Sequence, residues 1–289
     1  MTTVTAESAP RGDRFDPRAF PQYARLSRAE RLFLRTCCYY PPRPHRTRTL
    51  ETVVDTARYV AEYDRGFGPG LWSIIAGQHV LDLGCGEGGH VLAMAERGAA
   101  YVTGVDVEHF FALAEEDCRR RGDDRVSFLL ADSRALPDAA FDVVVSHDSF
   151  EHFEDAATML ADMVRLVRPG GRILIKFGKP WRSPYGRHMS GTLRRDRPWV
   201  HLLFPERSVM RVHSVYHDDP VLYERYADLS GGLNKMTLGR FRRLLRSQPG
   251  LRIDEFHLKG LYGIQPLTAV PVLNELFTVE VCAYCTRLR

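Results

Sequence analysis

A cluster of glycines ends the apolar run that begins at Val80. The segment reads Val80-Leu-Asp-Leu-Gly-Cys-Gly-Glu-Gly-Gly89. Glycine lets the backbone turn sharply and lets a ligand lie against it with no Cβ in between. The helix expected next would expose unpaired N–H groups at its start. Gly84, Gly86 and Gly89 also satisfy the G-x-G-x-x-G spacing of dinucleotide-binding proteins. The segment therefore predicts a nucleotide-like ligand without saying which one.

Three aspartates narrow the choice of ligand, because each lies at or near the end of a predicted strand. Asp82 lies two residues before the first glycine, where its carboxylate can reach the amino-acid end of a ligand. Asp106 follows 24 residues later and can accept both hydroxyls of an unphosphorylated ribose. Asp132 ends the next strand and can accept an adenine amino group. One such aspartate is more often a helix cap, but three in order beside a glycine turn favour a shared ligand crevice.

These motifs resemble the class I (Rossmann-like) S-adenosylmethionine-dependent methyltransferases of the small-molecule type over about residues 60–178. Asp82-Leu-Gly-Cys-Gly-Glu-Gly88 resembles the family's first motif, Asp106 its ribose-binding acid and Ala131-Asp-Ser133 its adenine motif. Phe141–Ser146 and Leu166–Gly171 resemble its fourth strand and the turn into its fifth. The resemblance implies S-adenosyl-L-methionine as cofactor. The residues expected to hold it are Asp82, Gly84, Cys85, Gly86, Gly88, Asp106, Val107, Asp132, Ser133 and Ser146.

Alternating strands and helices must position these residues. Short apolar runs predict strands at 79–83, 101–105, 126–130, 141–146 and 172–177, and helices are expected near 89–98, 108–121 and 154–168. Strands separated by helices indicate a parallel sheet with right-handed crossovers. A helix at 236–247 and strands at 251–258 and 277–286 close the chain. The family resemblance implies a seven-stranded, mostly parallel α/β sheet with helices on both faces and an antiparallel last strand.

The same pattern predicts four parts. Residues 1–65 form a loose arm (to about residue 25) and two helices separated by prolines at 41–44, and belong partly to a cap. Residues 66–178 form the cofactor-binding core, and residues 236–289 supply its last helix and strands. Residues 179–235 show no clean period, and we expect them to be an inserted cap that binds the substrate.

The loop after the fourth strand is the expected border of the reacting methyl group. It reads Ser146-His-Asp-Ser-Phe-Glu-His-Phe-Glu-Asp155. Asp148, Glu151 and His152 resemble, with Asp for the first Glu, the E-x-x-E-H of ubiquinone-biosynthesis O-methyltransferases, where the group is associated with a divalent cation. Such oxygen and imidazole ligands suit Mg²⁺ or Zn²⁺. A Glu-His pair also occurs in methyltransferases that bind no metal, so both readings stay open.

Aromatic residues in the 179–235 segment can wall an apolar substrate pocket, although part of them will only pack the cap. They are Trp181, Tyr185, Trp199, Phe204 and Tyr216. His188 and His201 lie among these aromatics. A base is needed only if the acceptor atom arrives protonated. The candidates for that base, in no order, are His147, His152, His188 and His201.

Other functions remain as alternatives. A nicotinamide oxidoreductase would commonly carry Tyr-x-x-x-Lys, and none of the four lysines has a tyrosine four residues before it. A base-amino methyltransferase acting on nucleic acid would usually carry Asn/Asp-Pro-Pro-Tyr/Phe after the fourth strand, and Ser146-His-Asp-Ser149 has no proline. A protein substrate, or a cofactor-binding protein without turnover, fits the same motifs. The acceptor favoured here is a small bacterial specialised metabolite.

Composition sets few further limits. A formal net charge of +4 gives no strong field that would argue for a polyanionic partner, and 44% hydrophobic residues suffice for a real core. The six cysteines show no disulfide framework, and Cys282 and Cys285 point to opposite faces of the expected last strand. No apolar run approaches 18 residues and no signal-peptide stretch begins the sequence. We expect a cytoplasmic enzyme with no membrane or nucleic-acid partner; a homodimer is possible.

Overall fold

The computed structural model describes residues 16–38, 49–188, 197–229, 231–261 and 264–288. The chain divides into two compact units. Residues 1–45 with 187–230 form one, called the helical unit below, and residues 46–186 with 231–289 form the other, called the sheet unit. In the described part of the chain, no helix has the length and apolar character that a bilayer-crossing helix requires.

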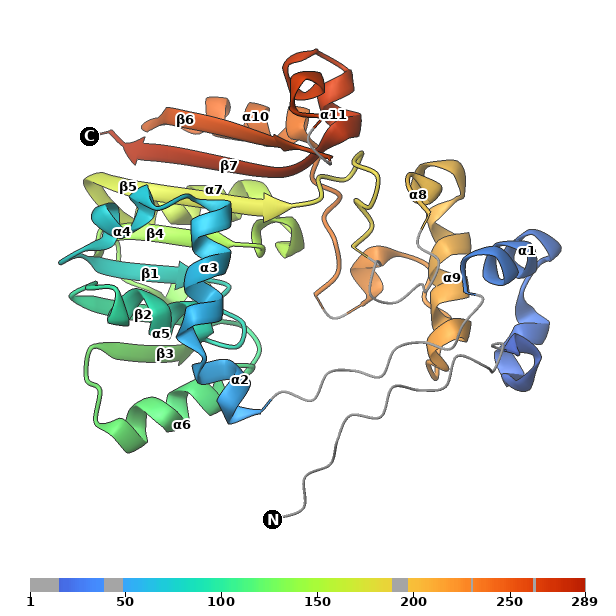
Figure 1. The fold of residues 1–289 in the computed structure, drawn as a ribbon, viewed down its shortest axis with the longest axis horizontal. Coiled ribbons are helices and arrows are strands. Elements are labelled where there is room, and N and C mark those ends of the chain that lie inside the picture. Colours follow the sequence, from blue (N-terminus) through green and yellow to red (C-terminus); the bar gives the residue numbers. More distant parts are fainter. Residues whose placement is uncertain (1–15, 39–48, 189–196, 230, 262–263, 289) are drawn as a thin grey trace. The chain divides into compact units, whose positions relative to one another are not determined.

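The sheet unit is built on seven strands in the order β3-β2-β1-β4-β5-β7-β6 (Figure 1). The strands are β1 (His79–Leu83), β2 (Tyr101–Asp106), β3 (Val126–Leu130), β4 (Phe141–His147), β5 (Val167–Gly178), β6 (Leu251–Gly260) and β7 (Thr278–Arg287). β1 to β5 pair in parallel, and β7 runs antiparallel to both of its neighbours, β5 and β6. The predicted seven-stranded, mostly parallel sheet with an antiparallel last strand is confirmed.

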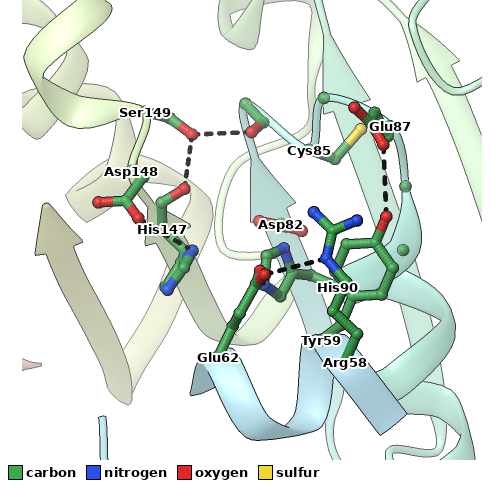
Figure 2. Close-up of a pocket in the computed structure, with 14 residues that line it drawn as sticks. Arg58, Tyr59, Glu62, Asp82, Cys85, Glu87, His90, His147, Asp148 and Ser149 are labelled. Carbon is green, nitrogen blue, oxygen red and sulfur yellow. Dashed lines mark hydrogen bonds and ion pairs between the residues drawn. The ribbon is translucent and has the colours of Figure 1, made fainter. Parts of the chain in front are cut away.

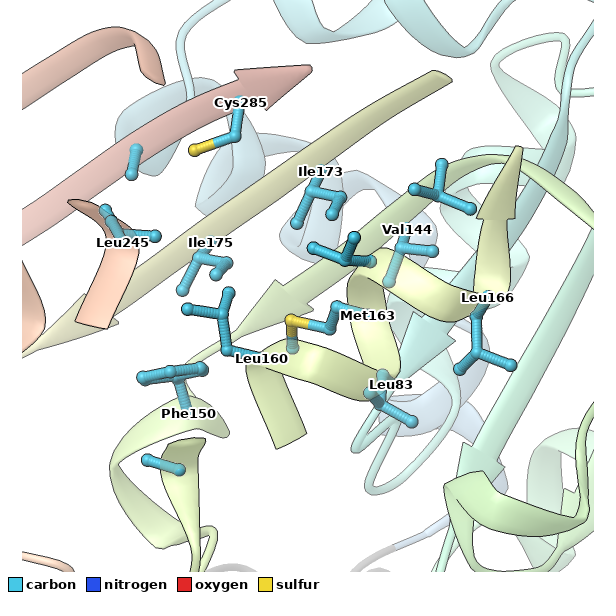
Figure 3. Close-up of a cluster of buried hydrophobic side chains, with 14 of the residues drawn as sticks. Leu83, Val144, Phe150, Leu160, Met163, Leu166, Ile173, Ile175, Leu245 and Cys285 are labelled. Carbon is cyan, nitrogen blue, oxygen red and sulfur yellow. The ribbon is translucent and has the colours of Figure 1, made fainter. Parts of the chain in front are cut away.

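Helices cover both faces of the sheet. Those of the sheet unit are α2 (Leu50–Val54), α3 (Thr56–Gly66), α4 (Gly70–Ile75), α5 (Gly89–Glu96), α6 (Ala112–Arg121), α7 (Ala156–Leu166), α10 (Leu238–Ser247) and α11 (Leu273–Phe277). Buried residues of α3 to α6 form one core with one face of the sheet. α7 and α10 pack on the other face, where Leu160, Met163 and Leu245 meet Ile173 and Ile175 (Figure 3).

Alternation along the strands decides which face each side chain covers. On β5, Leu174 faces the α3–α6 core while Ile173 and Ile175 face α7 and α10. On β7, Cys282 joins the first core and Cys285 the second, so this C-x-x-C cannot gather two thiolates around one metal. The two side chains thus lie on opposite faces, as the sequence pattern predicted, and both thiols are free and buried.

The helical unit contains α1 (Arg28–Cys37), α8 (Val200–Leu203) and α9 (Glu206–His217). The side chain of Ser27 accepts a hydrogen bond from the backbone of Glu30, whose carboxylate accepts one from the backbone of Ser27, and this capping box starts α1. α9 lies in the segment expected to lack periodicity, and seven of its twelve residues are buried. Its histidines, serines and arginines interrupt the apolar helical spacing, so the sequence pattern did not predict this helix.

The N-terminal region contains α1 in the first predicted helical stretch and α2 and α3 in the second, but its division between the units differs from the prediction. α2, α3 and the unpredicted short helix α4 belong to the sheet unit, which begins at Arg46 rather than at residue 66. Within the arm expected to be loose, residues 17–19 and 21–25 form short 3₁₀ helices, while residues 1–15 lie outside the described residues. The proline break at 41–44 also lies outside them. That 179–235 acts as a substrate cap stays a prediction.

Replacing Leu160 of α7 by alanine tests the core under α7. Leu160 is 1% exposed between the helix and the sheet, so Leu160→Ala leaves a cavity and should lower the free energy of unfolding by about 3 kcal/mol. Leu130→Ala is the matched control, because Leu130 on β3 is 59% exposed and should change stability by less than about 0.5 kcal/mol. Urea unfolding followed by circular dichroism measures both. Equal losses in the two variants would contradict this core.

Candidate functional site

The glycine turn between β1 and α5 takes a backbone that only glycine adopts easily. Gly84, Gly86 and Gly88 have φ values of +81°, +52° and +82°. A Cβ on Gly88 would also come within 2.7 Å of the Phe128 ring and 2.8 Å of the Ala114 side chain. The turn is tied to β2, because the backbone N–H groups of Gly84 and Cys85 both donate to the Val105 carbonyl. The fold itself therefore favours glycine at these three positions.

Two cavities meet at this turn. The first, called the α3 cavity, has a volume of about 280 Å³ and is lined by Arg58, Tyr59, Glu62, Asp82, Gly84, Cys85, Gly86, Glu87, Gly88, Gly89, His90, His147, Asp148 and Ser149 (Figure 2). The second, called the β2–β3 cavity, has a volume of about 500 Å³ and lies beyond the ends of β2 and β3. It is lined by Leu83, Gly84, Gly86, Val105, Asp106, Val107, Glu108, Phe110, Ala131, Asp132, Ser133, Asp148, Ser149, His152, Phe153, Met159, Gly231 and Gly232.

Asp106 at the end of β2 is oriented by two backbone hydrogen bonds. Its Oδ2 accepts from the N–H of Gly86 at 2.9 Å, and its Oδ1 accepts from the N–H of Glu108 at 3.0 Å. A carboxylate has about four acceptor positions, so two N–H donors leave capacity for further hydroxyl donors. Dinucleotide-binding folds use an acid at this place for ribose hydroxyls, and ribose recognition by Asp106 stays a prediction.

Asp132 behaves differently from Asp106, although it too lines the β2–β3 cavity. Its carboxylate accepts from the backbone and the guanidinium of Arg134 and caps a 3₁₀ turn at Ser133–Ala135. These hydrogen bonds lower the pKa of Asp132 to about 2. The capping role that is common for aspartates at strand ends is therefore present here, and adenine recognition by Asp132 stays a prediction.

Asp82 is a buried carboxylate at the wall of the α3 cavity. It is 2% exposed, and within the described residues no hydrogen bond or ion pair reaches its side chain. Burial raises the pKa of Asp82 to about 6, although the nearby His90 lowers it somewhat. A buried carboxylate without a partner is destabilising by itself, and a donor brought into the cavity would relieve that penalty.

Helix α3 supplies the outer wall of the α3 cavity, which the sequence did not predict. The ring of Tyr59 occupies the place of a side chain at Gly89, where a Cβ would lie 2.0 Å from a ring carbon. Glu62 accepts from Nε of Arg58 at 3.1 Å and lies 3.4 Å from Nε2 of His90. Glu62 follows Tyr59 by three residues and Arg58 by four, a spacing that predicts one shared helix face. The spacing does not predict which surface this face packs against.

Asp148 follows β4 and lines both cavities. Its Oδ2 accepts from Nζ of Lys176 at 2.7 Å and its Oδ1 accepts from the N–H of Gly178 at 2.7 Å. Partial burial alone would raise its pKa, but the positive charge of Lys176 and these hydrogen bonds hold the pKa of Asp148 below its usual value. Asp148 is therefore an ionised carboxylate with a fixed orientation.

The histidine next to Asp148 is a weak base. Burial, together with the charges of His90 and Lys176, lowers the pKa of His147 to about 3. His147 lines the α3 cavity, but a neutral imidazole with this pKa accepts a proton poorly at neutral pH. His152 lines the β2–β3 cavity, with Nδ1 at 2.5 Å from the Gly231 carbonyl oxygen. His188 and His201, the other two candidates for the base, belong to the helical unit, where His201 is buried in α8.

The proposed metal ligands Asp148, Glu151 and His152 do not form one ligand set in the described structure. Among the described residues, Asp148 joins no group of potential ligands whose atoms lie within 4.8 Å of one another. Its oxygens face Lys176 and Gly178 instead. Burial raises the pKa of Glu151 well above its usual value, which favours the neutral acid over the carboxylate that Mg²⁺ prefers. Asp148 is therefore engaged in an ion pair, and the predicted set of three ligands is not assembled among the described residues.

The expected cofactor residues gather around the two cavities with one exception. Those that line a cavity are Asp82, Gly84, Cys85, Gly86, Gly88, Asp106, Val107, Asp132 and Ser133. Ser146 lines neither, because it is the penultimate residue of β4 and is fully buried. β4 runs one residue further than expected, and Ser149 reaches the cavities instead, where its hydroxyl donates to the Gly84 carbonyl at 2.8 Å.

The apolar wall expected from the 179–235 segment is divided between the units. Trp181 and Tyr185 belong to the sheet unit, and Trp199, Phe204 and Tyr216 to the helical unit. In the helical unit Tyr216 is fully buried as part of the packing, and the ring of Phe204 packs 5.0 Å from that of Phe33. Part of this aromatic set is therefore core.

Comparisons with known proteins agree on the sheet unit. Residues 81–175 match a family model described as a methyltransferase domain. The 27-O-demethylrifamycin SV methyltransferase of Amycolatopsis mediterranei is 36% identical over 110 residues, covering 37% of this chain and 40% of that protein. Methyltransferase GfsG of Streptomyces halstedii is 39% identical over 106 residues, covering 35% and 38%. The chain thus spans about two fifths of the length of these relatives.

A solved structure shares the fold. The crystal structure of a candidate S-adenosylmethionine-dependent methyltransferase from Listeria monocytogenes superposes with a TM-score of 0.51 at 16% identity. The superposition covers 81% of this chain and all of that one. At this identity the likeness concerns the fold alone.

Asp82→Asn tests the buried, unpaired carboxylate. The folded protein raises the pKa of Asp82 to about 6, against about 3.9 in an unfolded chain. The ionised form therefore destabilises the fold above pH 6, and the penalty fades as the pH falls through 6 toward 4. We expect Asp82→Asn to stabilise the ligand-free protein by about 2–3 kcal/mol at pH 7.5 and by about half as much at pH 5.

Urea unfolding at the two pH values measures the difference. Asp155→Asn is the control, because Asp155 caps α7 and its hydrogen bond with Thr158 lowers its pKa, so no stabilisation follows there. An Asp82→Asn variant no more stable than the parent at pH 7.5 would show that the carboxylate has a partner.

Proposed function

Since residues 81–175 match a family model described as a methyltransferase domain, we propose that this chain is a class I methyltransferase that transfers the methyl group of S-adenosylmethionine to a small molecule. The acceptor atom would be an oxygen, nitrogen or carbon of a bacterial specialised metabolite. The observation that carries the proposal is the pair of adjoining cavities, each with its own carboxylate, on either side of one glycine turn.

The residues fit the two halves of this cofactor. Asp106 has acceptor capacity left for the ribose hydroxyls in the β2–β3 cavity. Asp82, buried and without a partner among the described residues, suits the ammonium group of the amino-acid half in the α3 cavity. An ammonium group there would offset the cost of burying the ionised carboxylate, which is the cause of the raised pKa of Asp82. Glu62 of α3, Glu87 and Asp148 are further carboxylates on the same cavity.

When bound, S-adenosylmethionine supplies an electrophilic methyl group on a neutral, good leaving group. The chain's own part is then to bind and align the reactants and to exclude water. Tyr59, packed against Gly89, closes one side of the α3 cavity. Asp148 and Ser149 border both cavities. His152 is the candidate base that lines the β2–β3 cavity, and it is needed only for an acceptor that arrives protonated.

The small-molecule acceptor rests on two lines of support. The relative from Amycolatopsis mediterranei is named as a methyltransferase of 27-O-demethylrifamycin SV, a small molecule. The sequence also has no proline-containing motif after β4 of the kind that holds a flipped base. The proposal needs no divalent cation, since Asp148 is engaged by Lys176.

Binding of three adenosine compounds tests the assignment of the two cavities. S-adenosylmethionine and S-adenosylhomocysteine carry an amino-acid end, and 5′-methylthioadenosine lacks it. By isothermal titration calorimetry, Asp106→Ala should weaken all three about tenfold or more, because all three contain the ribose diol. Asp82→Asn should weaken only the two compounds with the amino-acid end. If the parent protein binds none of the three, the proposed function is wrong.

Transfer itself is tested with S-adenosylmethionine that carries a trideuterated methyl group, incubated with a bacterial metabolite extract. We expect one metabolite to gain the mass of one labelled methyl group in the presence of the parent protein. The Asp106→Ala variant is the control. Labelling of protein or nucleic acid instead of a metabolite would overturn the small-molecule acceptor.

A further inference from the structure

The α3 cavity and the β2–β3 cavity have four lining residues in common. They are Gly84, Gly86, Asp148 and Ser149. The two glycines offer only backbone, and the Ser149 hydroxyl already donates to the carbonyls of Gly84 and His147. Asp148 is the one member of these four that carries a charge. Figure 2 shows it beside Ser149, on the loop opposite the helix that carries Tyr59 and Glu62.

Asp148 keeps its place through several restraints. Its backbone is left-handed, with φ +52°, a conformation that Asp and Asn tolerate better than most residues. Nζ of Lys176 and the N–H of Gly178 hold its two oxygens at 2.7 Å each. Lys176 is itself held, because its side chain is only 7% exposed and its Nζ lies 3.4 Å from Glu280 on β7. The Asp148 side chain nevertheless stays 44% exposed, with lone pairs free for the cavity.

The sulfur atom of S-adenosylmethionine joins the adenosyl half to the amino-acid half. If the two halves occupy the two cavities, as the proposed function requires, the residues common to both cavities face this atom. The sulfur carries a positive charge before methyl transfer and none afterwards. A fixed carboxylate at this place interacts with the charged form and far less with the neutral one.

We propose that Asp148, held by Lys176 and Gly178, is the counter-charge of the cofactor's sulfonium group and makes the site prefer S-adenosylmethionine over its demethylated product. This inference rests on the proposed function. The interaction stabilises the bound reactant more than the transition state, in which the positive charge on sulfur is already fading. It therefore acts on cofactor affinity and product release and does not speed the methyl transfer.

Asp148→Asn removes the charge and keeps the shape and the left-handed backbone. The probes are S-adenosylmethionine, sinefungin, which carries a cationic amine in place of the sulfonium methyl group, S-adenosylhomocysteine and 5′-methylthioadenosine, both neutral at sulfur. By calorimetry the variant should bind the two cationic probes about tenfold more weakly. It should bind the two neutral probes within twofold of the parent protein, which would also show that the site is intact.

Glu154→Gln is the matched control for net charge. Glu154 is exposed, lies six residues from Asp148 and lines neither cavity, so the ratio of affinities should not change. An equal loss for cationic and neutral probes in Asp148→Asn, or no loss for either, would overturn the role of Asp148 while leaving the proposed function standing. Failure of the parent protein to bind any of the four would overturn the proposed function itself.

Discussion

The parallel pairing of β1 with β2 and β4 is the constraint on which the rest of the site depends. Leu83 pairs with Val105, and the N–H groups of Gly84 and Cys85 continue this pairing by donating to the Val105 carbonyl. The carboxyl ends of these strands therefore meet at one edge of the sheet. The crevice that open α/β sheets use for ligands lies at this edge, and both cavities are built there.

The fold shifts the pKa values of two carboxylates at this edge in opposite directions. Asp82 is buried without a partner among the described residues, and its pKa rises to about 6. Asp148 is paired with Lys176, and its pKa falls. Burial without compensation and burial beside a cation act in opposite directions on the same chemical group. A cationic group of a ligand would compensate the buried carboxylate of Asp82. Asp148, which is paired with Lys176, stays negatively charged.

Much of the sheet unit could be predicted from the sequence because its signals are local. The apolar runs gave β1 and β3 to the residue, and β2 and β4 to within one residue. The sequence did not predict α9 because many polar residues interrupt its apolar spacing. It did not predict α4 because this helix has only six residues. Ser146 was expected to bind the cofactor, but it is buried within β4. The strand ends at His147, and the left-handed Asp148 then turns the chain so that Ser149 reaches the glycine turn.

By itself, the sequence determined the strand order along the chain, the glycine turn and the acids at the strand tips, because period and turn chemistry depend on near neighbours. Only the tertiary structure decided what those residues meet. It placed Tyr59 over Gly89 and Glu62 beside His90, and it brought Lys176 of β5 to Asp148. Such contacts join residues that are 28 or more positions apart in the chain. Neither a helical spacing nor a single lysine in the sequence indicates which distant residue it will contact.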